Sequence, residues 1–243
     1  MDSPSVILTA AAILFAASYL QSATGFGGAI FCMALLPLVI PVYDAIAFVS
    51  ASSFLVLVMV IFANRSGLSL KNAGPLCIGM VIGIPIGYYS LRQLDGEFIK
   101  RTLGAILMII VVAEFLQGRF AKWKIPEKAG ALFGIVGGVL AGAFNVGGPP
   151  VVAYVYSRKW SKVEMVAILQ AVFIAGVIAR NLLMLGAGEF TMDLMKMVAW
   201  ATPAAAIAVW LGKLTLDRLP LPILKRIVFS LIFLIGLKYL IGW

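Results

Sequence analysis

Residues 22–28 read SATGFGG, and residues 144–150 read FNVGGPP. Each glycine-rich stretch interrupts a long apolar segment, and the two lie 120 positions apart, since Gly27-Gly28 recurs as Gly147-Gly148. Glycine and proline in such runs interrupt helices. Backbone polar groups freed by the interruption cannot face lipid, so they must face protein or a polar cavity. These two breaks therefore determine how the chain folds.

The composition around the breaks is that of a membrane protein. Of 243 residues, 63% are hydrophobic and 12% are charged, and the mean hydropathy is +1.07. This leaves too little polar surface for a soluble globular fold. Apolar segments of roughly 15 to 25 residues recur along the chain, as expected for helices that cross a bilayer. We expect an all-α membrane protein whose partner is the lipid bilayer. The net charge of +9 is explained by basic cytoplasmic loops, so no nucleic acid is expected to bind.

The apolar segments form two matching series. In residues 1–120 we expect a broken element at 4–42, followed by helices at 45–63, 73–91 and 98–117. In residues 121–243 we expect a broken element at 129–156, followed by helices at 163–185, 194–211 and 223–241. Asp44 and Glu164 open equivalent helices, and Pro85 matches Pro203. This pattern indicates an internal duplication, which is common in transporters.

Each broken element is predicted to be a re-entrant hairpin of two half-helices, because 28 residues with a break inside cannot cross a membrane twice. The loops at 64–71, 118–128, 157–164 and 212–226 then share one side and hold 13 of the 19 Lys and Arg residues. That side is assigned as the cytoplasm, which places both termini outside the inner membrane. The predicted fold is an inverted-topology repeat, each half a broken re-entrant helical hairpin plus three transmembrane helices.

The breaks are the predicted site for a small anionic substrate. Each presents the N-terminus of its second half-helix, whose unpaired N–H groups attract anions. Glycine lets the backbone approach a ligand, and neighbouring amides and hydroxyls donate hydrogen bonds. The predicted contacts are Gln21, Ser22, Thr24, Gly25, Gly27, Gly28, Asn145, Gly147, Gly148 and Pro149. The alternative is that the glycines only allow helices to pack closely.

Four polar residues within predicted helices are further candidates: Ser50, Gln170, Arg180 and Asn181. Asn181 follows Gln170 by about three helical turns and returns to nearly the same face. Ser50 is the repeat equivalent of Gln170. Gln170 either lines the cavity or forms a hydrogen bond between helices. Arg180 lies deeper within a predicted span than the other basic residues, so it either attracts the anion or snorkels to the interface.

Several function classes are excluded by the residues that the sequence lacks. There is no Walker-type nucleotide loop, no His and no pair of carboxylates at membrane depth, so neither an ATP-driven pump nor an enzyme is expected. Cys32 and Cys77 lie in apolar runs without metal-ligand spacing, and no metal or cofactor is expected. A secondary transporter coupled to protons or sodium is favoured. A passive anion channel and a non-transport membrane assembly factor are the alternatives, and the sequence leaves the oligomeric state open.

The stretches SATGFGGAIF (22–31) and AGAFNVGGPPVVAYVY (141–156) resemble the paired signatures of the TauE/SafE family of sulfite and sulfonate exporters. The resemblance covers the whole chain, including its duplication. It implies that the substrate is a small sulfur-containing anion, such as sulfite or an organosulfonate, which is moved across the cytoplasmic membrane. The resemblance further implies that the chain is an exporter. Neither composition nor spacing indicates sulfur, which enters through the resemblance alone.

Overall fold

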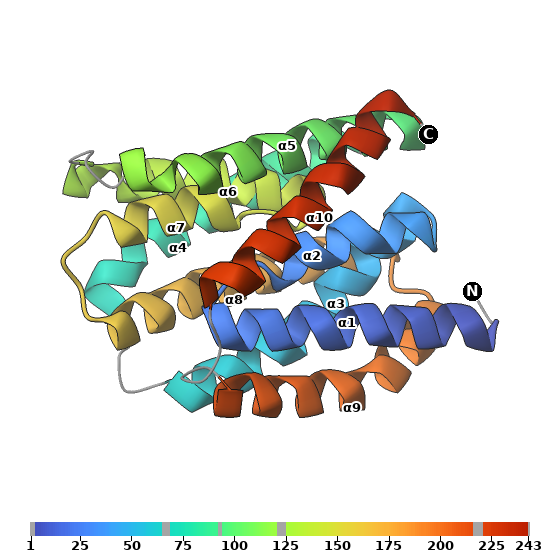
Figure 1. The fold of residues 1–243 in the computed structure, drawn as a ribbon. Coiled ribbons are helices and arrows are strands. Elements are labelled where there is room, and N and C mark those ends of the chain that lie inside the picture. Colours follow the sequence, from blue (N-terminus) through green and yellow to red (C-terminus); the bar gives the residue numbers. More distant parts are fainter. Residues whose placement is uncertain (1–2, 65–68, 92–93, 121–124, 216–220, 243) are drawn as a thin grey trace. The chain divides into compact units, whose positions relative to one another are not determined.

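The computed structural model describes residues 3–64, 69–91, 94–120, 125–215 and 221–242, and these residues form helices and no strand (Figure 1). The helices are α1 (Pro4–Thr24), α2 (Gly28–Leu35), η1 (Leu36–Leu38), α3 (Val42–Asn64), α4 (Leu70–Leu91), α5 (Gly96–Phe120), η3 (Glu127–Ala129), α6 (Gly130–Phe144), α7 (Gly148–Tyr156), α8 (Lys162–Gly186), α9 (Met192–Thr215) and α10 (Leu221–Ile241). The predicted all-α fold is confirmed. Parts of the predicted basic loops, at 65–68, 121–124 and 216–220, lie outside the described residues.

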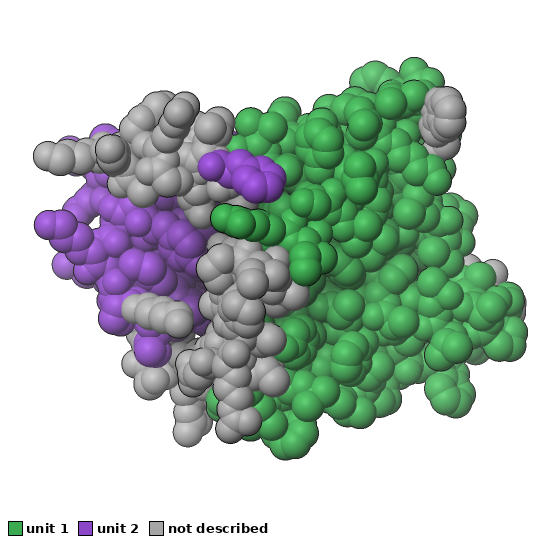
Figure 2. Space-filling view, in the orientation of Figure 1, with its two compact units in different colours: residues 1–52, 94–114, 190–243 green, residues 53–93, 115–189 purple. Residues whose placement is uncertain are grey.

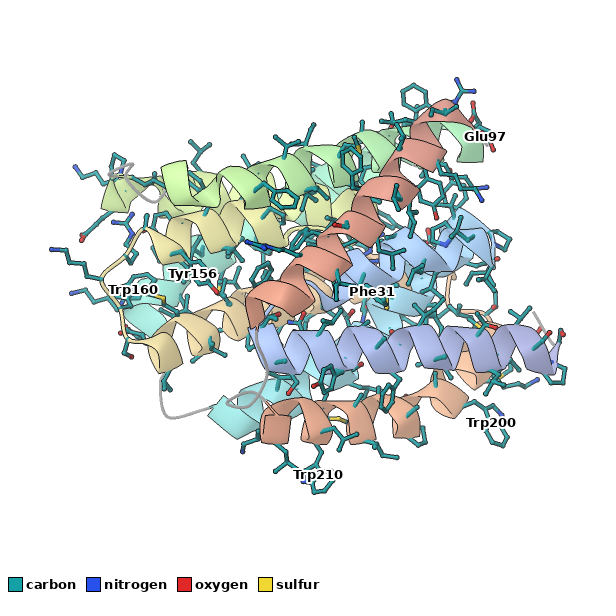
Figure 3. All side chains as sticks on the ribbon, viewed as in Figure 1. Phe31, Glu97, Tyr156, Trp160, Trp200 and Trp210 are labelled. Carbon is teal, nitrogen blue, oxygen red and sulfur yellow. The ribbon has the colours of Figure 1, made fainter. Side chains whose placement is uncertain are left out.

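The helices have the length and surface of membrane-spanning segments. In the described part of the chain, six segments are long and apolar enough to cross a bilayer: Pro4–Thr24, Val42–Val60, Lys71–Leu91, Glu127–Phe144, Val163–Gly186 and Met192–Leu214. Large apolar side chains are exposed on them. Trp200 and Trp210, for example, point outward from α9 and are 74% and 62% exposed (Figure 3). Exposed apolar surface of this extent is suited to contact with lipid.

Both helix breaks fall where the sequence predicts them. α1 ends before Gly25 and α2 begins at Gly28, while α6 ends before Asn145 and α7 begins at Gly148. The first pair differs from the two half-helices predicted. α1 has 21 residues, a length of about 31 Å that suffices for a full crossing, whereas α2 has only 8. The reason is that nothing interrupts the apolar run between Pro4 and the first glycine of the break.

The chain forms two compact units (Figure 2). Unit 1 consists of Met1–Ser52, Leu94–Glu114 and Phe190–Trp243, and unit 2 consists of Ser53–Gln93 and Phe115–Glu189. Each unit therefore combines residues from both predicted repeats. The division into duplicated halves at 1–120 and 121–243 concerns the sequence and stays a prediction.

Unit 1 holds the first break. In this unit α1 packs along α9, and α2 packs against α1 and α10. The Tyr239 hydroxyl on α10 donates a hydrogen bond of 2.7 Å to the carbonyl of Ala34 on α2. Ser22 Oγ on α1 donates one of 2.8 Å to the carbonyl of Val209 on α9. The first break is thus held by hydrogen bonds with two helices that lie far away in the sequence.

Unit 2 holds the second break, and two stripes of glycine set its packing. Gly79, Gly83 and Gly87 on α4 face α6, and Gly134, Gly138 and Gly142 on α6 face α4. A Cβ atom at any of the six would collide with a backbone carbonyl oxygen of the opposite helix, so only glycine permits this approach. The stripes recur every four residues in the sequence, but the spacing alone does not identify α6 as the partner of α4. α8 packs against α4 and also contacts α6 and α7.

Candidate functional site

The first break is closed by the side chain of Gln21. Gln21 Oε1 accepts a hydrogen bond of 3.0 Å from the N–H of Gly28, the first residue of α2, and Nε2 donates one of 3.3 Å to the carbonyl of Gly25. Gln21 is buried, and its amide spans the break. One of the N–H groups that a helix start leaves unpaired is therefore satisfied within the protein.

The other predicted donors of the first break also act within the fold. Thr24 Oγ1 lies 2.8 Å from the carbonyl oxygen of Leu20 and 2.5 Å from that of Phe26, and Ser22 bonds to α9 as described above. Gly25 and Gly27 have φ of 81° and 96°, in the left-handed region that favours glycine. Their conformation supports the turn between α1 and α2.

Gly28 is a packing position. A Cβ atom there would lie 2.6 Å from the carbonyl oxygen of Ala17, so a side chain would push α2 away from α1. Gly104 has the same character, because its Cβ would lie 2.7 Å from the carbonyl oxygen of Gly236. The close contact at Gly28 therefore fits the alternative that the glycines allow helices to pack closely.

A small cavity of about 30 Å³ adjoins the first break. It is lined by Leu20, Thr24, Phe26, Gly27 and Ile30, and by Val228, Phe229 and Ile232 of α10. This volume accommodates about two water molecules. The lining is mainly apolar, with the Thr24 hydroxyl as its polar side chain. The cavity is therefore too small and too apolar to enclose a sulfonate.

The second break has a different backbone. Asn145 has φ 59° and ψ 19°, and among the described residues it is the one non-glycine residue with positive φ. Asparagine tolerates this left-handed conformation better than most residues, and it ends helices for that reason. The Asn145 N–H donates a hydrogen bond of 2.9 Å to the carbonyl of Ala141, which completes the end of α6.

The start of α7 leaves backbone donors without acceptors. Pro149 and Pro150 have no N–H, so Gly147 and Gly148 provide the N–H groups at this helix start. No acceptor in the described part of the chain bonds to either N–H. Gly147 has an ordinary φ of −77°, and glycine is needed there because a Cβ would collide with the carbonyl oxygen of Gly137.

Arg180 on α8 extends its side chain to the second break. It is 2% exposed, and its Nη1 donates hydrogen bonds to the carbonyls of Ala141 and Gly142 in the last turn of α6. A cation at this position stabilises the negative end of the α6 dipole. The Nε atom of Arg180 is buried and has no hydrogen-bond partner in the part of the chain that the structure describes. The snorkelling alternative is wrong for this structure, because the guanidinium is buried against α6.

The structure separates the other predicted contacts by unit. Ser50 lies in unit 1, whereas Gln170 and Asn181 lie on α8 in unit 2, the helix that also carries Arg180. Ser50 and Gln170 are fully buried. Ser50, Gln170, Asn181 and Asn145 all have interaction partners within the protein. Unit 2 thus brings together Asn145, Gly147, Gly148 and Pro149 with the helix that bears Gln170, Arg180 and Asn181.

Two residues near Arg180 were missed by sequence reasoning. The Glu189 carboxylate acts electrostatically on Arg180, and it accepts a hydrogen bond of 2.6 Å from the Tyr88 hydroxyl. Glu189 follows α8 by three residues and Tyr88 lies on α4. Glu189 follows the end of a predicted span. Nothing in the sequence indicates that its carboxylate lies close to Arg180, nine residues earlier.

The arrangement is suited to binding an anion rather than to catalysis. The second break offers two backbone N–H groups and a buried guanidinium, all of which are donors. Within the described residues, no group of three or more His, Cys, Asp or Glu side chains could hold a metal ion.

The chain is similar to proteins of one known family. Residues 10–239 match the family model described as Sulfite exporter TauE/SafE. The chain is 25% identical over 235 residues to the "Probable sulfite/organosulfonate exporter TauE" of Cupriavidus necator, and the match covers 93% of this chain and 90% of that protein. No solved structure matches the chain. The chain belongs to the TauE/SafE family of multi-pass membrane transporters, which are not enzymes.

Proposed function

We propose that this protein exports a small anion with a sulfite or sulfonate group across the cytoplasmic membrane, and that the second break makes the main contact with it. The observation that carries the proposal is Arg180, which is 2% exposed and directed at the break, and whose buried Nε has no hydrogen-bond partner among the described residues. Buried polar groups are rarely left unpaired in proteins, so an unpaired one at a break points to a ligand.

The backbone supports the same assignment. The N–H groups of Gly147 and Gly148 stand at the positive end of α7, where anions are stabilised. The name of the Cupriavidus necator protein supports sulfite or an organosulfonate as the anion. In the first break the corresponding donor, the Gly28 N–H, is bonded to Gln21. Gln21, Ser22 and Thr24 then shape the first break, and the hypothesis that both breaks contact one substrate stays a prediction.

The test is transport and binding by the purified protein and by Arg180→Gln. Liposomes containing the protein are assayed with sulfite, ethanesulfonate, sulfate and acetate, with and without a pH gradient. A charge-assisted hydrogen bond contributes about 1.5 to 3 kcal/mol, so binding of the preferred anion should weaken about 10- to 150-fold in the variant. Arg101→Gln, which changes an exposed arginine on α5, is the matched control. Wild-type affinity in folded Arg180→Gln would overturn the proposal, and rapid flux that no gradient can drive uphill would favour a channel.

The proposed topology has both termini outside the cytoplasm. Within unit 1, the start of α1 and the end of α10 lie toward the same side (Figure 1). This agrees with the 13 of 19 basic residues in loops assigned to the cytoplasm. Reporter fusions at Trp243 and within residues 118–128 should give opposite signals. Two cytoplasmic signals would contradict the inverted repeat.

A further inference from the structure

We propose that the segment before α6 and the turn between α7 and α8 form a binding surface for the headgroups of anionic phospholipids. We call it the basic surface of unit 2, and it consists of Lys128, Arg158, Lys159 and Trp160. Arg158 follows Gly148, the first residue of α7, by ten positions, which is roughly 15 Å along a helix. The surface is therefore separate from the second break and does not depend on the proposed transport function.

Arg158 joins the turn after α7 to the segment before α6. Its guanidinium carbon lies 4.1 Å from the centroid of the Tyr154 ring, and its Nη2 donates a hydrogen bond of 2.9 Å to the carbonyl of Pro126. The Tyr154 hydroxyl donates one of 2.9 Å to the carbonyl of Glu127. Tyr154 is 5% exposed, so its ring is a fixed platform on which the guanidinium stacks. Two segments that lie 32 positions apart are thus held together, and their basic side chains gather on one surface.

Most hydrogen-bond donors of Arg158 have no acceptor within the described residues. A guanidinium has five N–H groups, and the carbonyl of Pro126 accepts one of them. No other described residue bonds to Arg158, and its buried Nε has no hydrogen-bond partner among them. A guanidinium that stacks on an aromatic ring can still bind a phosphate along its edge, through two parallel hydrogen bonds. Arg158 is therefore held in position while it keeps donors for a phosphate group.

The positive charge of this surface is not balanced by carboxylates. None of its three basic side chains forms an ion pair with a described residue. Glu127 is exposed and takes part through its backbone carbonyl, and Glu164 Oε1 accepts a hydrogen bond of 2.8 Å from Asn72. In the sequence, residues 118–128 and 157–164 together contain seven Lys and Arg and two Glu. The excess of positive charge is complementary to an anionic headgroup.

The surface lies where membrane-spanning segments begin. Two segments that are long and apolar enough to cross a bilayer start beside it, Glu127–Phe144 and Val163–Gly186. Trp160 follows the end of α7, and its ring packs edge-on against Tyr154 with the ring centroids 6.4 Å apart (Figure 3). Tryptophan is enriched at the membrane–water interface, at the level of the headgroups. The basic side chains beside Trp160 are therefore expected at the depth of the lipid phosphates, which makes a lipid the occupant.

The experiment measures the dissociation constants of phosphatidylglycerol and phosphatidylcholine for the full-length protein in detergent, by native mass spectrometry. We expect the wild type to prefer phosphatidylglycerol. The double variant Lys128→Gln/Lys159→Gln should lose about 25-fold of this preference, because each basic residue near anionic lipid contributes about five-fold. Lys100→Gln/Arg101→Gln is the matched control, since it removes two basic residues of α5 that lie outside the basic surface. It should keep the wild-type preference.

Arg158→Lys is the second variant. It keeps the charge but loses the planar edge, so it should retain part of the preference for phosphatidylglycerol. Glycerophosphoglycerol, the soluble headgroup, should bind far more weakly than the lipid. Equal affinity of the wild type for both lipids would overturn the inference, and so would an unchanged preference in folded Lys128→Gln/Lys159→Gln or an equal loss in the control. Binding of the soluble headgroup as tight as that of the lipid would also overturn it, because the surface would then take a soluble phosphate ester.

Discussion

The two breaks occupy equivalent positions in the sequence, yet they use their polar groups differently. In the first break, the amide of Gln21 satisfies the Gly28 N–H and the Gly25 carbonyl. In the second break, the N–H groups of Gly147 and Gly148 have no acceptor among the described residues, and Arg180 supplies a buried charge. This difference indicates that the N-terminus of a helix can bind a ligand only where its backbone N–H groups are not already hydrogen-bonded within the protein.

The predicted duplication makes the two breaks repeat equivalents, and the residues at matching positions differ. At the offset of 120 residues, Gly25 corresponds to Asn145 and Val60 corresponds to Arg180. The counterpart of the charged residue is therefore apolar. The comparison predicts that changes in the first break act mainly on stability and changes in the second break act mainly on binding.

The largest effect is expected for Gln21→Leu. The substitution leaves the Gly28 N–H and the Gly25 carbonyl without partners in a buried position, and each unpaired group costs about 1 to 3 kcal/mol. The free energy of unfolding should fall by about 2 to 4 kcal/mol, while anion affinity per folded molecule stays near the wild-type value. Thermal unfolding in detergent and anion binding provide the two measurements. Ser52→Ala is the control, since the Ser52 hydroxyl bonds only within its own helix, to Phe48 and Val49.

A smaller effect, and on binding rather than stability, is expected for Asn145→Gly. Glycine adopts the φ of 59° seen at this position, so the backbone of the break should persist without the amide. If the amide contributes a hydrogen bond to the anion, affinity should fall about three- to ten-fold. Calorimetric titration with ethanesulfonate measures this change. Unchanged affinity together with lowered stability would make Asn145 a structural cap, as Gln21 is in the first break.

The smallest effect is expected for Ser22→Ala. The carbonyl of Val209 lies within α9, so it keeps its helical hydrogen bond when the Ser22 hydroxyl is removed. Stability should fall by about 0.5 to 1 kcal/mol, and binding should not change. A clear loss of anion affinity in folded Ser22→Ala would show that the first break also contacts substrate, which would remove the contrast between the breaks.

Much of the helical order was predictable, because each helix shows its own signal. The apolar runs specify the helices, and the two glycine-rich stretches specify the breaks, through local physics. The prediction that Pro4–Thr24 is a half-helix went beyond these local signals. It relied on the total length of residues 4–42, whereas no residue interrupts α1. The glycine stripes on α4 and α6 were visible as a spacing, but a stripe does not name the helix it will contact.

By itself, the sequence determined that this protein is a helical membrane protein with two broken helices, because hydropathy, glycine and proline act within a few residues of one another. Only the tertiary structure decided which break keeps unpaired donors. Gln21 reaches Gly28 across a turn, and Arg180 reaches Ala141 from 39 residues away. Those contacts depend on how helices pack, and the burial that gives Arg180 its influence exists only once α8 lies against α6.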